Sequence, residues 1–203
     1  MKASVLGLSL LLVCLTATSA FSQNDLYDNG PINGFNTAWS ISFGFTVSDQ
    51  FTLGTDSTVN GIQFGAWLDP GDTIESAEVS ITSSEFGGTS FVDETVSFTA
   101  SDCFSNGIVN VCTETGSLTP TALAAGSYWL NLSNASTVDG NPVVWDENSG
   151  PSLASESDLG TVPSESFTIL GNSNVSTTPE PSSIMLLGSG IVGLAGMLRR
   201  NWS

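Results

Sequence analysis

Trp39-Ser-Ile-Ser-Phe-Gly-Phe-Thr-Val47 is the stretch that most clearly indicates the fold. Every odd-numbered position in it is apolar, and serine, glycine or threonine stands at each position between. An apolar period of two is typical of a β-strand that buries one face and exposes the other. The stretch therefore predicts one continuous strand over residues 39–47.

Similar short runs recur along the rest of the chain, and none of them has the period of a helix. Turn-forming sequences such as Asp69-Pro-Gly-Asp72 and Asp139-Gly-Asn-Pro142 separate them. About nine strands at this spacing predict an all-β fold with a single antiparallel β-sandwich. We favour a jelly-roll order, but an immunoglobulin-like order fits the same pattern. The further predicted strands are residues 50–53, 59–68, 77–82, 91–99, 109–113, 127–133, 142–145 and 166–170, with a loop over 159–165.

The chain begins with a pattern typical of a secretory signal peptide. Lys2 precedes an apolar run from Val5 to Leu15, and small residues follow up to Ala20. We expect cleavage after Ala20, so residues 1–20 form the signal peptide. The sandwich domain is then expected over residues 21–170, followed by a polar linker over 171–178.

Residues 179–203 form three blocks that predict a membrane-directed tail. Pro179-Glu180-Pro181 is a stiff, extended spacer, because each proline disfavours helix at the residue before it. Residues 184–198 are predominantly apolar and predict a short transmembrane helix of about 22 Å, against a hydrocarbon core of about 30 Å. Arg199 and Arg200 end it and favour a cytoplasmic C-terminus. The domain itself is then expected on the other side of the membrane.

The order of these blocks resembles the PEP-CTERM sorting signal of exported bacterial proteins. The resemblance covers only the tail and implies processing near Pro179-Glu180-Pro181 by an exosortase-type transpeptidase. It also implies a diderm bacterium, transient anchoring in the inner membrane, and delivery to the cell surface or the extracellular space. It carries no activity into the domain. The alternative is an ordinary tail anchor, which needs no Pro-Glu-Pro.

The charges are distributed in a way that excludes several functions. All three basic residues, Lys2, Arg199 and Arg200, lie in the sorting segments, and the chain contains 20 acidic residues and no histidine. The domain therefore has no side chain that can pair with a carboxylate, act as a histidine base or clamp a phosphate. Nucleic acid is excluded as a partner because it would be repelled. Neutral exopolysaccharide, other proteins and divalent cations remain possible.

Two cysteines in the domain predict a disulfide. Cys103 and Cys112 flank a segment that contains Asn106-Gly107, a strong hairpin signal. A hairpin with its loop at residues 106–109 places the two cysteines opposite each other. An exported protein meets an oxidising compartment, so we expect the bond to form.

Two tryptophans are candidates for stacking against a sugar ring. Strand alternation places Trp67 and Trp129 on faces that otherwise carry glycine, serine, asparagine and glutamine. The alternative, which we favour, is that loops or neighbouring strands pack against both rings.

Aspartates at the turns are candidates for a structural Ca²⁺, since calcium prefers oxygen ligands. Asp69 and Asp72 lie at the two ends of one turn, and Asp139 with Asn141 forms a similar group. The alternative is ordinary turn chemistry, because aspartate, asparagine and glycine favour turns without any metal.

The sequence therefore predicts an exported, non-enzymatic surface or extracellular-matrix protein. The first alternative is a carbohydrate-binding module for neutral exopolysaccharide. The second is a glycoside hydrolase that needs only two carboxylates. Asp146–Glu147 and Asp93–Glu94 are poor candidates for such a pair, because neighbours along a strand point to opposite faces.

Overall fold

The computed structural model describes residues 24–35 and 37–174. The predicted signal peptide, sorting motif and C-terminal helix lie outside these residues. Within the described ranges there is no helix that is long and apolar enough to cross a membrane.

The described part of the chain consists of strands and the turns between them, as predicted. The strands are β1 (Asn24–Asp28), β2 (Ala38–Ser40), β3 (Thr46–Leu53), β4 (Ser57–Leu68), β5 (Ile74–Ser84), β6 (Gly87–Val96), β7 (Phe98–Ser105), β8 (Asn110–Leu123), β9 (Gly126–Thr137), β10 (Val144–Asp146), β11 (Ala154–Glu156), β12 (Gly160–Val162) and β13 (Phe167–Ser173).

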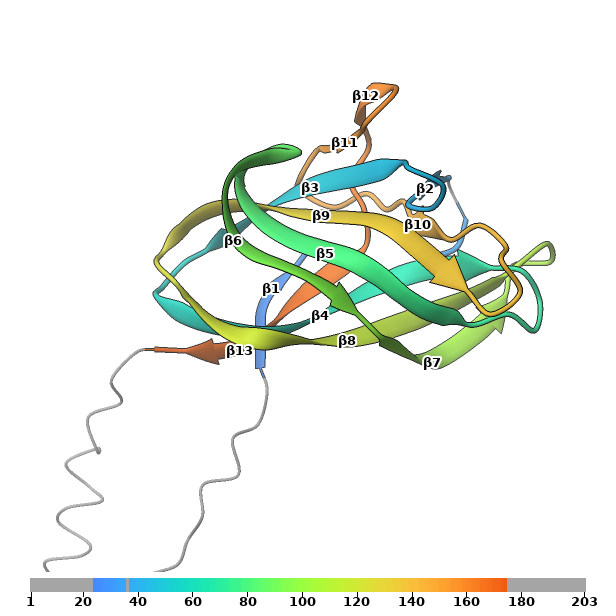
Figure 1. Cartoon of the computed structure of the whole chain (residues 1–203), viewed down its shortest axis with the longest axis horizontal. Coiled ribbons are helices and arrows are strands. Elements are labelled where there is room, and N and C mark those ends of the chain that lie inside the picture. Colours follow the sequence, from blue (N-terminus) through green and yellow to red (C-terminus); the bar gives the residue numbers. More distant parts are fainter. Residues whose placement is uncertain (1–23, 36, 175–203) are drawn as a thin grey trace, which may run out of the picture.

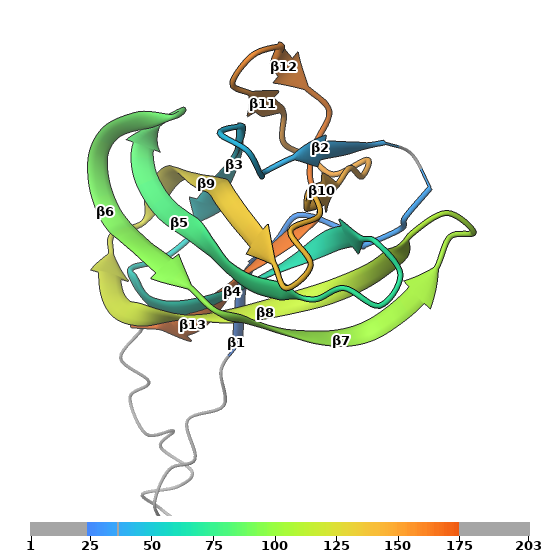
Figure 2. The ribbon, with the colours of Figure 1, turned by 45° about the vertical axis from the view of Figure 1, so that its right-hand side comes forward.

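The strands form two antiparallel sheets that face each other as a sandwich (Figures 1 and 2). In the first sheet β4 is central and pairs with β8, which pairs with β7. The other side of β4 pairs with β13, then β1, along its first part and with β10, then β2, along its second part. The second sheet has the order β12-β11-β3-β9-β5-β6. The all-β class and the two antiparallel sheets are therefore confirmed.

Apolar residues at alternate positions of both sheets form the core. Ile62, Phe64 and Ala66 of β4 face Val47, Phe51 and other residues of the second sheet, and all of these are buried. At the centre the Trp145 ring packs edge-on against Phe64 and Phe167, at centroid distances of 6.0 and 5.7 Å. Burial of such large rings stabilises the domain mainly through the hydrophobic effect.

The prediction of one continuous strand over residues 39–47 is wrong. β2 ends at Ser40 in the first sheet, and β3 begins at Thr46 in the second. Between them Phe43 and Gly44 have φ angles of 58° and 92°, and the amide of Phe45 donates to the Ser42 carbonyl. Phe43 is 71% exposed. The apolar alternation thus continues through a turn that moves the chain from one sheet to the other.

Other boundaries also differ from the prediction. The predicted strand over 91–99 is divided at residue 97, so that β6 belongs to the second sheet and β7 to the first. β8 extends well beyond the predicted 109–113. The expected loop over 159–165 contains β12, and β13 continues to Ser173, past the predicted domain boundary at residue 170. β1 and β11 were not predicted at all.

Both ends of the described chain lie at the same end of the sandwich (Figure 1). Asn24 is opposite Gly171 in the register of β1 and β13. Ser173 is opposite Ser57, which in turn is opposite Leu123. The turns at residues 69–73 and 106–109 lie at the other end, because β4 and β8 run the full length between the two ends.

Candidate functional site

The most unusual feature of the interior is a group of four buried carboxylates, which we call the acidic cluster. It consists of Asp49, Asp146, Glu147 and Glu165, and none is more than 9% exposed. Asp49 alternates along β3 with Val47 and Phe51, so it faces the core rather than the solvent. Burial of a charge is costly unless a partner compensates it. The described domain has no lysine, arginine or histidine to do so.

The backbone next to β10 explains why these carboxylates are close together. Glu147 and Glu165 are paired in an isolated antiparallel bridge, so their side chains stand on the same side. The amide of Ser166 donates to the Asp146 carbonyl at 2.8 Å and continues this pairing. The side chains of Asp146 and Ser166 then lie on the opposite side, where the Ser166 hydroxyl donates to Asp146 at 3.4 Å.

Asn29 is the main hydrogen-bonding partner at the Asp49 side of the cluster. Its side-chain nitrogen lies 3.1 Å from Asp49 Oδ2 and 2.7 Å from the Glu165 carbonyl oxygen. The hydroxyl oxygens of Ser152 and Ser164 lie 2.7 and 2.8 Å from the same nitrogen. The Tyr27 hydroxyl donates to Asn29 Oδ1 at 2.6 Å. An uncharged amide therefore occupies the centre of a shell of oxygens.

Three buried oxygens of the cluster have no hydrogen-bond partner within the described residues. They are Asp49 Oδ1 and both side-chain oxygens of Glu165. Burial raises the pKa of Asp49 to about 6. Burial also raises the pKa of Glu165 well above its usual value, with further contributions from the charges of Asp49, Glu147 and Asp146. The surroundings of Glu165 thus favour its neutral, protonated form.

Asp146 is held differently and determines the position of Trp67. Its carboxylate accepts from the Trp67 indole at 2.6 Å and from the amides of Asn33 and Gly34 at 2.8 and 3.0 Å. Burial still raises the pKa of Asp146, although these hydrogen bonds oppose the shift. The residue 30–35 loop therefore packs on the outer face of the first sheet, beside the half-buried Trp67 ring.

The structure does not bring Trp67 and Trp129 together. Trp67 is on the outer face of the first sheet, because its neighbours Ala66 and Leu68 face the core. Trp129 is on the outer face of the second sheet, because Tyr128 and Leu130 face the core. Trp129 is half-buried as well. The two rings cannot contribute to one binding site.

The turn aspartates are partly brought together. Asp72 accepts hydrogen bonds from the amide of Asp139 at 3.2 Å and from the side-chain amide of Asn141 at 3.1 Å. Burial acts to raise the pKa of Asp72, but these bonds and those of Thr137 and Thr73 outweigh it and lower the pKa. Protein donors thus contact both carboxylate oxygens of Asp72. Across residues 24–35 and 37–174, no three Asp, Glu, His or Cys side chains are grouped so that they could hold a metal ion.

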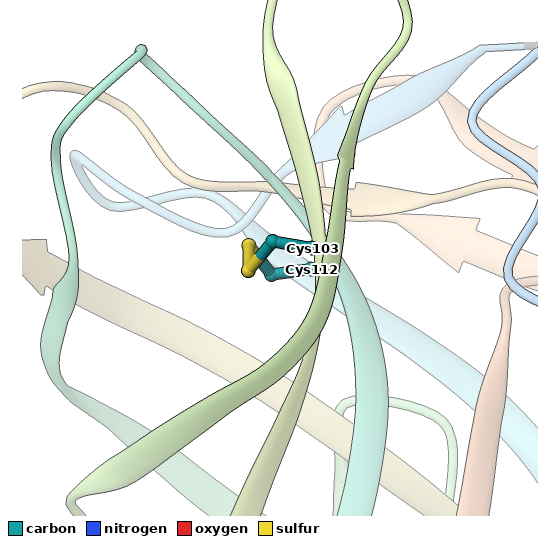
Figure 3. The surroundings of a disulfide bond; sticks show 2 residues. All are labelled: Cys103 and Cys112. Carbon is teal, nitrogen blue, oxygen red and sulfur yellow. A yellow bond between two sulfur atoms is a disulfide. The ribbon is translucent and has the colours of Figure 1, made fainter.

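The predicted disulfide between Cys103 and Cys112 is confirmed (Figure 3). It joins β7 to β8, with a Cα–Cα distance of 4.1 Å. The amide of Asn106 donates to the Val109 carbonyl at 3.2 Å, which closes the hairpin at the predicted residues. Gly107 has a φ angle of 96°, a conformation that glycine adopts easily.

The adjacent carboxylates proposed as poor catalytic pairs point apart, as strand geometry requires. The Asp146 carboxylate meets the Trp67 indole, whereas Glu147 accepts from the Trp39 indole at 3.3 Å. Glu94 accepts from the amide and hydroxyl of Thr119. Its neighbour Asp93 is exposed.

Sequence reasoning missed the acidic cluster, although one signal was present. Val47, Asp49, Phe51 and Leu53 share a strand face, so an aspartate stands at an apolar position of the pattern. The prediction ended one strand at residue 47 and began the next at residue 50, which hid this position. Glu165 had no comparable signal, because it precedes β13 in what was predicted as a loop.

Comparison with known proteins identifies the tail and not the domain. No curated protein is similar enough to the chain to count as a match. Residues 177–200 match the model of the PEP-CTERM protein-sorting motif. The chain therefore carries a PEP-CTERM sorting motif over residues 177–200, and such a motif suggests exosortase-linked sorting to the cell surface.

Proposed function

We propose that this protein is a non-enzymatic component of the cell surface or extracellular matrix, processed at Pro179-Glu180-Pro181 by an exosortase-type transpeptidase. The observation that supports this most is the sorting motif over residues 177–200. In this proposal the signal peptide is removed after Ala20. The 184–198 helix holds the protein transiently in the inner membrane, with Arg199 and Arg200 in the cytoplasm.

The arrangement of the domain suits delivery from one end. Asn24 and Ser173 leave the same end of the sandwich, so a tether on either side of the domain extends from that end. The turns at residues 69–73 and 106–109 are then directed away from the attachment point. A compact sandwich with a disulfide is also suited to an oxidising environment outside the cytoplasm.

The experiment that tests this proposal is an intact mass of the protein recovered from outside its native cell. We expect a species that starts near Phe21, ends near Pro179-Glu180-Pro181, and is lighter by two hydrogens because of the disulfide. Additional mass at the new C-terminus would identify the group to which the protein is attached. A species that still contains Arg199 and Arg200 would contradict processing and leave an ordinary tail anchor.

Binding of neutral exopolysaccharide is a second candidate function, favoured by the outer face of β8. Three hydroxyl side chains alternate along this face, and Gln63 of β4 donates to one of them, Thr115, at 3.0 Å. The three are Thr113, Thr115 and Ser117. Titration with a neutral polysaccharide should then change the tryptophan fluorescence of the wild-type protein. A Trp129→Phe variant should bind the polysaccharide with the same affinity as the wild type, because Trp129 lies on the other sheet. Unchanged fluorescence and no retention on the immobilised polysaccharide would exclude this function.

A further inference from the structure

The β10–β13 connection contains β11 and β12, which extend the second sheet at its edge beyond β3 (Figure 2). We call residues 148–166 the acidic flap. β11 pairs with β3, and the amide of Ser157 donates to the Thr46 carbonyl at 2.9 Å. Asn29 makes further contacts with Ser152, Ser164 and the Glu165 carbonyl, and the Glu165 amide donates to Asp49 Oδ2 at 2.8 Å. The flap is therefore held to β1 and β3 mainly by short polar contacts rather than by a large apolar surface.

Glu165 is the residue of the acidic flap whose ionised form is unfavourable at the buried position that it occupies. It is fully buried, and neither of its side-chain oxygens has a partner in the described residues. The charged groups that act on it are Asp49 from β3, Asp146 at the end of β10, and Glu147 next to β10, and all of them are acidic. Tyr27 of β1 lies on the far side of Asn29 and carries no positive charge. No cationic side chain exists between residues 24 and 174 to balance an ionised Glu165.

A neutral Glu165 can remain in this environment, whereas an ionised one is repelled by Asp49 and Glu147 and loses its hydration. The least costly structural response to the ionisation of Glu165 is a local opening of the flap, not unfolding of the whole domain. Glu165 can reach water if the flap leaves β3 and Asn29, while β4, β8, β9 and the apolar core stay in place. Local openings of this kind are common where a segment is held by few apolar contacts.

We propose that the acidic flap is a pH-dependent latch, docked on β1 and β3 while Glu165 is protonated and released when Glu165 ionises. The direction follows from the raised pKa values of Glu165 and of Asp49, the latter about 6, since the docked state binds more protons than the open state. Docking is complete in acid and is lost as pH rises through the pKa values of the docked state. For an exported protein, this would change the exposed surface as the surroundings change from acidic to alkaline.

The test is amide hydrogen exchange of the full folded domain at pH 5 to 9, corrected for the intrinsic exchange rate at each pH, with chelator present. In the wild type we expect residues 154–164 to lose at least tenfold in protection as pH rises, while β4 and β9 keep theirs. Glu165→Gln keeps the shape but cannot ionise, so its flap should stay protected throughout. Asp49→Asn removes the largest of the repulsions on Glu165 and should reduce the opening without abolishing it, which provides a second test if Glu165→Gln folds poorly.

Glu114→Gln is the matched control, because Glu114 is also a buried carboxylate but lies on β8, away from the flap. Its flap should open as in the wild type. Constant protection of residues 154–164 across the pH range, or equal opening in wild type and Glu165→Gln, would overturn the proposal. Restored protection at pH 8 on adding calcium chloride would also overturn it, because a metal ion rather than a proton would then balance the cluster.

Discussion

The side-chain nitrogen of Asn29 donates a hydrogen bond to Asp49 Oδ2 at 3.1 Å, which links the segment after β1 to the second sheet. In most domains a lysine or arginine would be the usual partner of a buried aspartate. Here the domain contains neither, and a neutral amide takes that position. A hydrogen bond to a charged group contributes more to stability than one between neutral groups. Asn29 should therefore contribute more to stability than a typical buried asparagine.

Replacing Asn29 by aspartate should severely destabilise the domain. The substitution exchanges the donor for a carboxylate that faces Asp49 Oδ2 and the Glu165 carbonyl. We expect a loss of about 3 kcal/mol or more in the free energy of unfolding at pH 7, because a buried charge is left without a partner. Denaturant unfolding followed by tryptophan fluorescence measures this loss.

Asn172→Asp is the control for the added negative charge. Asn172 is half-buried on β13, away from the acidic cluster. This variant has the same net charge as Asn29→Asp. A similar loss in the free energy of unfolding of both variants would therefore mean that overall charge repulsion, and not the loss of the Asn29 contacts, causes the effect.

The stability of the domain should fall as pH rises from about 5 to 7, in part because of Glu114. This residue is 1% exposed, and burial raises its pKa from an ordinary 4.5 to about 7. The folded state therefore holds a proton that the unfolded state has released, so its contribution is full below pH 4.5 and is lost as pH rises through 7. The slope from one such group is at most about 1.4 kcal/mol per pH unit.

Glu114→Gln should make this decline shallower, as measured by denaturant unfolding at pH 5, 6 and 7. Glu75→Gln is the comparison, because Glu75 is exposed and the substitution removes the same charge. If Glu114→Gln and the wild type change in parallel with pH, then Glu114 does not hold a proton in the folded state.

Removing the disulfide should destabilise the domain without unfolding it. The bond links residues nine positions apart, and closure of so short a loop is worth about 2.5–3 kcal/mol in the chain-entropy model. Cys103→Ala with Cys112→Ala should lower the free energy of unfolding by about this amount. Reducing agent should lower the wild type similarly and leave the double variant unchanged. A wild type that is insensitive to full reduction would show that the bond contributes nothing to stability.

Gly171→Ala should be clearly more harmful than Gly54→Ala. A Cβ atom at Gly171 would overlap the Thr58 carbonyl oxygen and the Leu26 side chain, where β13 and β4 have an irregular register. We expect a loss of about 1–3 kcal/mol from this overpacking. A Cβ at Gly54 meets nothing within 4 Å, so that variant should be neutral or slightly stabilised. Equal melting temperatures for the two variants would mean that β13 shifts freely against β4.

Several features could be predicted from the sequence because they depend on neighbours along the chain. Strand alternation predicted β4, β5 and β9 to within a few residues, since one face of each carries the buried apolar side chains. The Asn106-Gly107 turn between two cysteines predicted the disulfide. The three blocks of the tail predicted the PEP-CTERM motif.

Local patterns failed where the chain passes from one sheet to the other. The apolar alternation from Trp39 to Val47 continues without a break through the turn at Phe43, because Phe43 is apolar although its side chain is exposed. The run from Phe91 to Thr99 likewise continues from β6 into β7, although these strands belong to different sheets. Alternation reports which side of the local backbone is apolar, and it contains no information about the sheet to which that backbone belongs.

The sequence by itself determined the fold class, the disulfide, the sorting motif and the absence of cationic side chains between residues 24 and 174. Only the tertiary structure decided that Asp49 meets Glu165 and Asn29, and that Trp67 and Trp129 lie on different sheets. These relationships join residues separated by 20 to 116 positions. They arise when two sheets pack face to face, and sheet packing is a global balance of buried area and satisfied polar groups that no local segment encodes.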